Sequence, residues 1–255
     1  IGGFAAATYS RGVRFMHIPT TLLAMVDASI GGKLGFNFGG IKNQLGLFQS
    51  PEAVLIHPEF LKTLDHRQLL AGWAEMIKHG LIHSEQHLEA LLYRTPQEVE
   101  WKVWEQLIYD SLQIKNYYVN QDPKESGLRK ILNFGHTLGH AFESLAMQKN
   151  ESLLHGEAVA NGMICEIYLS EKKAGFPERV AKRTRIYILE HYKTLNLKDE
   201  DIISLWQYMQ MDKKNTNNEV KSVLLEDVGA PLPEETIHEN EFKESLDFYR
   251  ELTRN

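Results

Sequence analysis

The sequence contains little cysteine, no long apolar run and no excess of positive charge. A single cysteine, Cys165, excludes an internal disulfide and fits a reducing compartment. No apolar run reaches about 18 residues and no basic stretch precedes a short apolar one, so neither a membrane span nor a signal peptide is expected. The formal net charge of -6 provides no basic field for binding phosphates. We therefore predict a cytoplasmic protein that binds small molecules, with no nucleic-acid or membrane partner.

What the sequence does contain is typical of a globular protein. Hydrophobic residues make up 43% of the chain and charged residues 24%, which is enough for a sizeable core. The first 65 residues are predicted to be α/β. Their features are a helical "FAAATYS", short strands in "VRFMHI" and "AVLI", a short helix in "TTLLAMVDAS" and a glycine-rich loop or tight hairpin at residues 30–43.

From His66 onward, apolar residues recur at three- and four-residue spacing, which predicts an all-helical domain covering residues 66–255. The boundary is expected near residue 65. A strand is predicted from Val220. Helices are predicted at 66–83, 97–120, 130–148, 154–173, 178–193, 199–211 and 239–252.

The segment "RKILNFGHTLGHAFE" carries His136 and His140 four residues apart, so both side chains can lie on one helical face. This spacing is typical of a metal site, although a pair of histidines hydrogen-bonded at a helix interface would have the same spacing. Zinc peptidases with H-E-x-x-H need a glutamate between the histidines, and here the inner residues are Thr137, Leu138 and Gly139. Peptidase chemistry is therefore not expected.

Two further segments offer ligands to the same metal. In "LLAGWAEMIKHGLIHS", Glu75 lies on a helical face with Lys78 and His79, and a buried carboxylate needs a cation. In "LLHGEAVANGM", His155 begins a helix with small residues. A surface pair of Glu75 with Lys78, and a capping or core role for His155, are the alternatives. Together, one carboxylate and two imidazoles from three helices permit a catalytic metal site with an open position.

Cations are concentrated near these motifs although the protein is acidic. Lysines in a glycine-rich loop and beside the histidine motif suggest a local anion site, and scattered surface lysines are the alternative. The "GGK" segment lacks the glycine spacing of a Walker motif and has Leu34 where Ser or Thr is required, so ATP is not implied. The cations concerned are Lys33, Lys42, Lys78, Lys115, Arg129, Lys213 and Lys214.

Five segments, in order along almost the whole chain, resemble the 3-dehydroquinate synthase family. They are "IPTTLLAMVDASIGGKLGFNFGGIKN", "FLKTL", "AEMIKHG", "SGLRKILNFGHTLGHAFE" and "LLHGEAVANGM". The resemblance implies a remnant of a Rossmann-like NAD domain at residues 1–65, followed by an all-α domain that binds metal and substrate. It also implies an NAD- and metal-dependent carbon-oxygen lyase that converts 3-deoxy-D-arabino-heptulosonate 7-phosphate into 3-dehydroquinate and phosphate in the shikimate pathway.

In the implied reaction, hydride passes transiently from the substrate's C5 to NAD, and the new ketone acidifies the neighbouring C6 proton. Phosphate is then eliminated. NADH returns the hydride, the ring opens, and an intramolecular aldol step closes the carbocycle, so the cofactor undergoes no net change. The substrate's own phosphate is a candidate base in the elimination.

The resemblance also assigns roles to individual residues. The implied ligands of the divalent metal, zinc or cobalt, are Glu75, His136 and His155, and His140 becomes a neighbouring site residue. The implied NAD contacts are Thr20, Thr21, Lys33, Lys42, Asn43, Phe60, Leu61, Lys62 and Thr63. The implied substrate contacts are Asp27, Lys33, Lys78, Lys115, Arg129, Asn133, His140 and one of Lys213 or Lys214.

One departure from the family pattern is that the chain starts just after the glycine-rich turn that cradles the pyrophosphate. We therefore expect weaker NAD binding and no turnover from these residues alone, while the intact protein is expected to be a homodimer. Alternatives are another sugar phosphate cyclase of the amino-dehydroquinate, inosose or valiolone synthase type, a metal-dependent polyol dehydrogenase, or a metal-binding fragment without activity.

Overall fold

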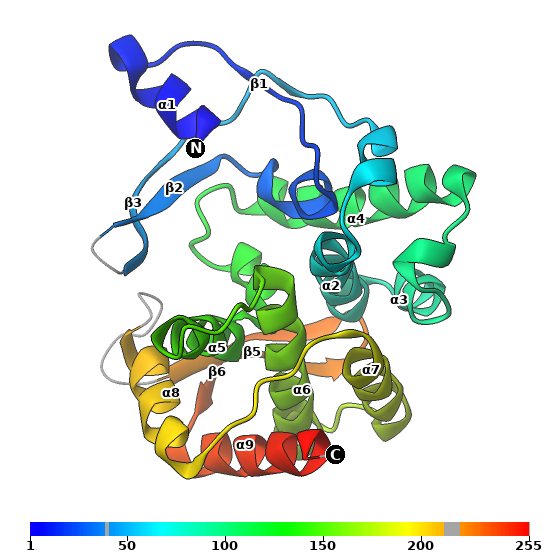
Figure 1. Cartoon of the computed structure of the whole chain (residues 1–255), viewed down its shortest axis with the longest axis vertical. Helices are drawn as coiled ribbons and strands as arrows, with labels where there is room; N and C mark the ends of the chain where they lie inside the picture. Colours follow the sequence, from blue (N-terminus) through cyan, green and yellow to red (C-terminus); the bar gives the residue numbers. More distant parts are fainter. Residues whose placement is uncertain (39–40, 212–219, 255) are drawn as a thin grey trace.

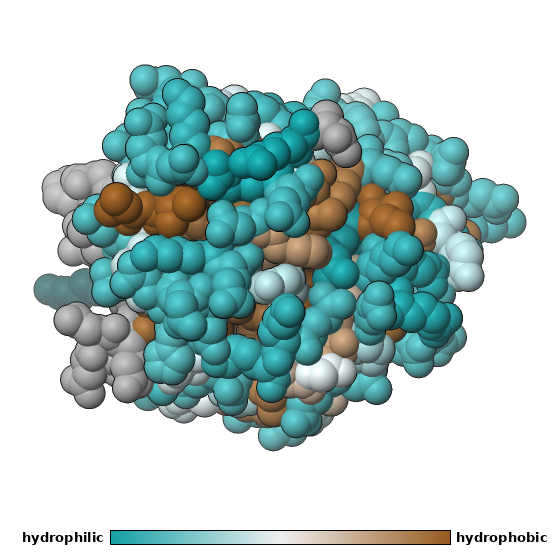
Figure 2. All heavy atoms as spheres, turned by 90° about the horizontal axis from the view of Figure 1, so that it is seen from below, coloured by the Kyte–Doolittle hydropathy of each residue, from teal (hydrophilic) through white to brown (hydrophobic). Residues whose placement is uncertain are grey.

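The computed structural model describes residues 1–38, 41–211 and 220–254, and Figure 1 shows their arrangement. The N-terminal segments lie on one side of helices α2 and α4, and most of the later helices lie on the other. Among the described residues, no helix combines the length and apolarity needed to cross a bilayer. The face in Figure 2 is largely hydrophilic, with separate hydrophobic patches.

The N-terminal part consists of short elements. Helix α1 (Gly2–Thr8) and the 3-10 turn η1 (Tyr9–Arg11) precede strand β1 (Met16–His17), which pairs in parallel with β4 (Ala53–Val54). Between these strands lie the π-helical turn η2 (Ala24–Ala28) and the antiparallel hairpin of β2 (Lys33–Phe38) and β3 (Ile41–Phe48). The 3-10 helix η3 (Pro58–Thr63) leads into the long helices. The α/β prediction is correct for this part, and the hairpin predicted at residues 30–43 is present.

The second part is mainly helical, and Asp65 begins it as an N-cap whose carboxylate accepts the Arg67 amide at 2.9 Å. One antiparallel hairpin, β5 (Val220–Asp227) with β6 (Ala230–Ile237), packs against the helices. The α-helices are α2 (His66–His83), α3 (Glu85–Leu92), α4 (Trp101–Gln121), α5 (His136–Gln148), α6 (His155–Ala174), α7 (Glu178–His191), α8 (Asp199–Met211) and α9 (Glu239–Thr253). Short 3-10 helices are η4 (Pro96–Glu98) and η5 (Leu128–Asn133).

Helix α6 is the centre of this part, because it packs against α2, α5, α7, α9 and β5 and is buried along most of its length. Two of its glycines permit the close packing. A Cβ atom on Gly156 would lie 2.0 Å from the Ala71 carbonyl oxygen on α2, and one on Gly162 would lie 2.1 Å from the Gly135 carbonyl oxygen beside α5. The backbones of α2 and α5 therefore approach α6 more closely than any side chain at these positions would allow.

The structure differs from the elements predicted for the second part in three places. Helix α3 and strand β6 were not predicted, and β6 completes a hairpin with the strand that was predicted from Val220. The helix predicted at residues 130–148 is two elements, η5 and α5. Gly135, with φ of 77°, and the extended Phe134 separate them. Strands β1 and β4 are also shorter than the sequence pattern indicated.

Candidate active site and metal centre

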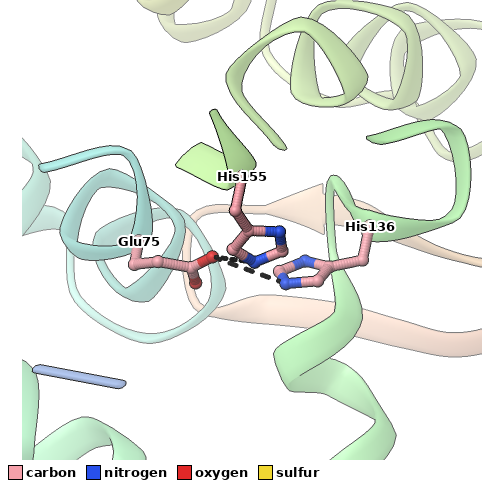
Figure 3. Close-up of side chains that lie close together, drawn as sticks. All are labelled: Glu75, His136 and His155. Atoms are coloured by element: carbon pink, nitrogen blue, oxygen red, sulfur yellow. Dashed lines mark ion pairs between the residues drawn. The ribbon is translucent and has the colours of Figure 1, made fainter. Parts of the chain in front are cut away.

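Three helices bring Glu75, His136 and His155 together (Figure 3). Glu75 lies in the middle of α2, whereas the two histidines are the first residues of α5 and α6. The Oε1 atom of Glu75 lies 3.4 Å from Nε2 of His136 and 3.3 Å from Nε2 of His155. One ligand atom from each residue lies within 4.8 Å of the others. The arrangement matches the donor set of one carboxylate and two imidazoles.

Both imidazoles are oriented by their Nδ1 atoms. Nδ1 of His136 lies 3.1 Å from the carbonyl oxygen of Phe134, and Nδ1 of His155 lies 3.3 Å from Oε1 of Glu143. These acceptors favour a proton on Nδ1 of each ring, so the Nε2 atom that faces Glu75 is the one that can bind a metal ion once it carries no proton. Metal-binding histidines in proteins are commonly held by such outer contacts.

Glu75 is fully buried, and its two oxygens face different partners. Its neighbours are charged or chargeable, because the ammonium of Lys78 contacts Oε2 and the two imidazoles face Oε1. Burial by itself would raise the pKa of Glu75, but the positive charge of Lys78, together with His155, holds that pKa well below its usual range. A buried carboxylate that stays ionised suits a cation.

His155 lies between two carboxylates. Although burial disfavours its charged form, the hydrogen bonds and charges of Glu143 and Glu75 raise the pKa of His155 to about 9. The negative potential that attracts a proton to this imidazole also attracts a divalent metal ion. The chemistry of the donor set therefore fits such an ion.

Two other groups of potential ligands overlap this cluster, His140 with Glu143 and His155, and Asp27 with Glu75 and His79. The ring centroid of His140 lies 5.4 Å from that of His136 and 6.1 Å from that of His155, so His140 borders the cluster. His79 is fully buried, and burial, followed by the charge of Lys78, puts its pKa well below the usual value.

Next to the cluster lies an alternating set of charges. Oδ1 of Asp27 lies 2.6 Å from the ammonium of Lys115 and 3.9 Å from that of Lys78, which links Asp27 to Glu75. Burial would raise the pKa of Asp27, but Lys115 holds it well below its usual range. Burial also lowers the pKa of Lys115, and Asp27 only partly offsets this. These buried ammonium groups are held close to Glu75 and the two imidazoles.

A second set of predicted residues surrounds Glu125. Its carboxylate forms an ion pair with Lys33 and accepts the side-chain amide of Asn133 at 2.9 Å. Glu125 has a φ of 59°, a left-handed conformation that residues other than glycine seldom adopt. Arg129 is buried, and its guanidinium donates to the carbonyl oxygens of Gly31 at 2.9 Å and Pro123 at 2.8 Å.

The turn between α4 and η5 is folded around Asp122. The carboxylate of Asp122 accepts the backbone amides of Ser126, Gly127 and Arg129 and the hydroxyl of Ser126. Hydrogen bonds from the Gly127 and Ser126 amides are the main reason that the pKa of Asp122 lies well below its usual range. This turn places Glu125 and Arg129 at the site.

Most of the predicted NAD contacts lie after two parallel strands, and Lys33 begins the hairpin strand β2. Thr20 and Thr21 follow the carboxyl end of β1, and the segment Phe60–Thr63 follows β4. The hydroxyl of Thr21 accepts the Ala24 amide at 3.2 Å, and the ammonium of Lys62 lies over the Trp101 ring, 2.8 Å from Glu59. Lys213 and Lys214 lie outside the described residues, as do the side chains of Lys42 and Asn43.

Sequence reasoning assigned no role to four acidic residues at the site. Asp122, Glu125 and Glu143 contact predicted site residues, and Glu166 accepts backbone amides on either side of His136. Glu143 carried a signal, because it lies one turn after His140 on the face of the histidines. The other three carried none, because their partners are distant in the sequence or are backbone amides.

The chain matches two family profiles, "3-dehydroquinate synthase N-terminal" over residues 1–71 and "3-dehydroquinate synthase C-terminal" over residues 72–215. A 3-dehydroquinate synthase from Parabacteroides distasonis is 45% identical over 251 residues, which cover 98% of this chain and 71% of that protein.

Two solved structures are also similar. A 2-epi-5-epi-valiolone synthase from Streptomyces hygroscopicus subsp. jinggangensis, with NAD⁺ and Zn²⁺ bound, has a TM-score of 0.85 and 26% identity, and the match covers 100% of this chain and 70% of that one. A 2-deoxy-scyllo-inosose synthase complexed with carbaglucose-6-phosphate, NAD⁺ and Co²⁺ has a TM-score of 0.79 and 27% identity, with 98% and 69% covered. On the profile matches and the identity to the curated relative, the chain belongs to the 3-dehydroquinate synthase family.

Proposed function

We propose that the protein converts 3-deoxy-D-arabino-heptulosonate 7-phosphate into 3-dehydroquinate and phosphate, using NAD and a divalent metal ion held by Glu75, His136 and His155. The observation that carries the proposal is the convergence of these three side chains from three helices, next to a set of buried cations. The 45% identity to a 3-dehydroquinate synthase favours this reaction over those of the cyclases at 26% and 27%.

At the metal centre, Glu75 provides the anionic ligand and the two Nε2 atoms provide neutral ligands. A zinc or cobalt ion bound there would supply Lewis acidity toward substrate hydroxyl groups. Phe134 and Glu143 keep the imidazoles turned toward Glu75. His140 borders the same space and is available to hold or donate a proton.

The substrate carries a carboxylate and a phosphate, and the residues nearest the metal cluster can bind both. Lys78 and Lys115 are buried ammonium groups whose present partners, Glu75 and Asp27, hold them in place. Arg129 adds a guanidinium, which suits carboxylate or phosphate because of its planar fork of donors. Lys33 and Asn133 are held together by Glu125. Preorganised cations of this kind stabilise developing negative charge at little reorganisation cost.

For NAD, we propose contacts from Thr20, Thr21 and the segment Phe60–Thr63. Ligands of open α/β sheets bind beyond the carboxyl ends of parallel strands, which is where these residues lie relative to β1 and β4. Bound NAD would supply a reversible hydride acceptor. Lys33 begins β2 near this region and also contacts Glu125, so it can serve the cofactor and the substrate sides.

The test is phosphate release from the heptulosonate phosphate, measured with and without NAD, with zinc and cobalt content determined on the same sample. We expect release that depends on both and is not accompanied by net NADH. Glucose 6-phosphate, whose carba-analogue occupies the inosose synthase structure, is the comparison substrate and should release none. Release from glucose 6-phosphate alone would assign the site to another cyclase, and steady NADH accumulation would indicate a dehydrogenase.

A further inference from the structure

Both imidazoles of the metal cluster are at the N-terminus of a helix. His136 is the first residue of α5 and His155 is the first residue of α6. The N-terminus of a helix carries unpaired amides and a partial positive charge, which disfavours a cation nearby. Two such ends at one metal site oppose binding of a divalent ion unless negative charge compensates them.

Each helix end is in contact with a buried carboxylate. At α6, Oε2 of Glu157 accepts the Leu154 amide at 2.7 Å, and Glu157 also pairs with the guanidinium of Arg67. At α5, the carboxylate comes from a different helix. Glu166 lies about three turns into α6, and none of its surface is exposed.

Glu166 accepts three backbone amides from the start of α5. Oε2 accepts Gly135 at 2.6 Å, and Oε1 accepts Thr137 at 3.1 Å and Leu138 at 3.3 Å. These amides flank His136 on both sides along the chain. The carboxylate therefore satisfies the unpaired donors of this turn and fixes the backbone from which the imidazole projects.

The geometry points to Glu166 as a positioning residue of the metal centre, holding the N-terminal turn of α5 against α6 and offsetting the positive end of α5 beside the bound cation. This inference rests on the proposed metal site. An ionised carboxylate suits the role because all four of its lone-pair directions accept. Glutamine cannot replace it fully, since its amide nitrogen would face an N–H group and its charge is absent.

Glu166→Gln in the complete protein, stripped of metal with a chelator and titrated with Co²⁺, is the test. We expect the Kd for Co²⁺ to rise at least roughly tenfold, the range seen when outer contacts of metal ligands are removed, and the visible Co²⁺ absorption to change. Ser170→Ala is the matched control. Ser170 is also fully buried on α6, donates to the Glu166 carbonyl at 2.7 Å and accepts the Leu225 amide at 3.0 Å. It should destabilise the metal-free protein while changing the Kd less than twofold.

An unchanged Kd and Co²⁺ spectrum in Glu166→Gln would overturn the inference, as would an equal loss in Ser170→Ala at equal destabilisation. If Glu166→Gln does not fold, Glu166→Asp decides. Aspartate keeps the negative charge, but its side chain is one methylene shorter and its carboxylate lies farther from the amides of α5. Weaker Co²⁺ binding and a shifted spectrum would support the positioning role of Glu166, and wild-type values would overturn it. Failure of the unaltered protein to bind Co²⁺ or Zn²⁺ would instead refute the metal centre itself, which separates the two outcomes.

Discussion

The two parts of the candidate site are built differently. Glu75, His136 and His155, the proposed metal ligands, lie on long, buried helices, and each of the two imidazoles is held by a second contact. Most of the predicted cofactor residues lie on short elements that follow strands of two residues, and near the first of these strands Met16 and Ile18 are 60% and 57% exposed. The comparison indicates that the positions of the metal ligands are set by the helix packing, whereas those of the cofactor residues depend on local turns and on the residues that link the two parts.

The largest effect is expected from the cluster itself. Replacing Glu75, His136 or His155 with alanine should remove the bound metal and lower turnover by roughly a thousandfold or more, beyond the effect of losing an outer contact. His140→Ala should keep most of the metal and damage turnover. Metal content by mass spectrometry, together with phosphate release, measures both. Loss of metal in His140→Ala with retention in His155→Ala would show that the ligands are misassigned.

The helical part also contains a group that should make it sensitive to acid. His87 is buried beside Ser111, with Nε2 2.8 Å from the hydroxyl, and burial lowers its pKa from 6.5 to about 4. As pH falls below 6.5, His87 becomes protonated in the unfolded chain but stays neutral in the folded protein. Stability should therefore be complete above pH 6.5 and decrease toward pH 4, by about 3 kcal/mol from this group.

Urea unfolding of the protein and of His87→Gln from pH 7.5 to 4.5 isolates this contribution, because the carboxylates titrate in both proteins. The free energy of unfolding of the wild type should fall more steeply than that of the variant. Parallel pH profiles would show that His87 is accessible to protons in the folded state.

Arg129 links the two parts, since it lies after α4 and donates to the Gly31 carbonyl. Arg129→Met or Lys115→Met should lower kcat/KM more than tenfold, as expected for a buried charge-assisted contact of roughly 1.5 to 3 kcal/mol. Lys124→Met removes an exposed charge from the same turn and is the control. The measurement is steady-state kinetics, with the metal content determined on the same samples. If kcat/KM of both variants stays within twofold of wild type, Arg129 and Lys115 do not contact the substrate.

The smallest effect concerns the short helical turn after β1. Thr21→Ala removes the hydroxyl that caps Ala24 and should cost about 1 kcal/mol of stability, while Thr21→Ser should cost much less. Neither variant should change the Kd for Co²⁺ if the metal cluster is independent of the first part. Chemical unfolding and Co²⁺ titration of both variants test this. A loss of Co²⁺ affinity that parallels the loss of stability would show that the metal site depends on the first part of the chain.

The sequence offered more signals for the proposed metal ligands than for the network around them. The spacing of His136 and His140 and the carboxylate of Glu75 in an apolar helix suggested a metal site, whereas the choice of His155 over His140 as a ligand came from the family resemblance. Helix α2 was predicted with its observed ends. Glu125 and Glu166 were not found because an acidic residue on a helix or in a turn is usually solvated, and their partners come from distant residues or from the backbone. The break between η5 and α5 at Gly135 was not predicted either, because the apolar periodicity continues across it. The Glu166 carboxylate, which accepts the Gly135 amide at this break, is distant in the sequence.

The close crossing of α2 and α6 determines the spacing of two metal ligands. Gly156 immediately follows His155, and it touches Ala71, one helical turn before Glu75. A side chain at Gly156 would push the two backbones apart and with them Glu75 and His155. A residue with no side chain thus helps to bring Glu75 and His155 within reach of one ion, and a search confined to chemically reactive side chains would overlook it.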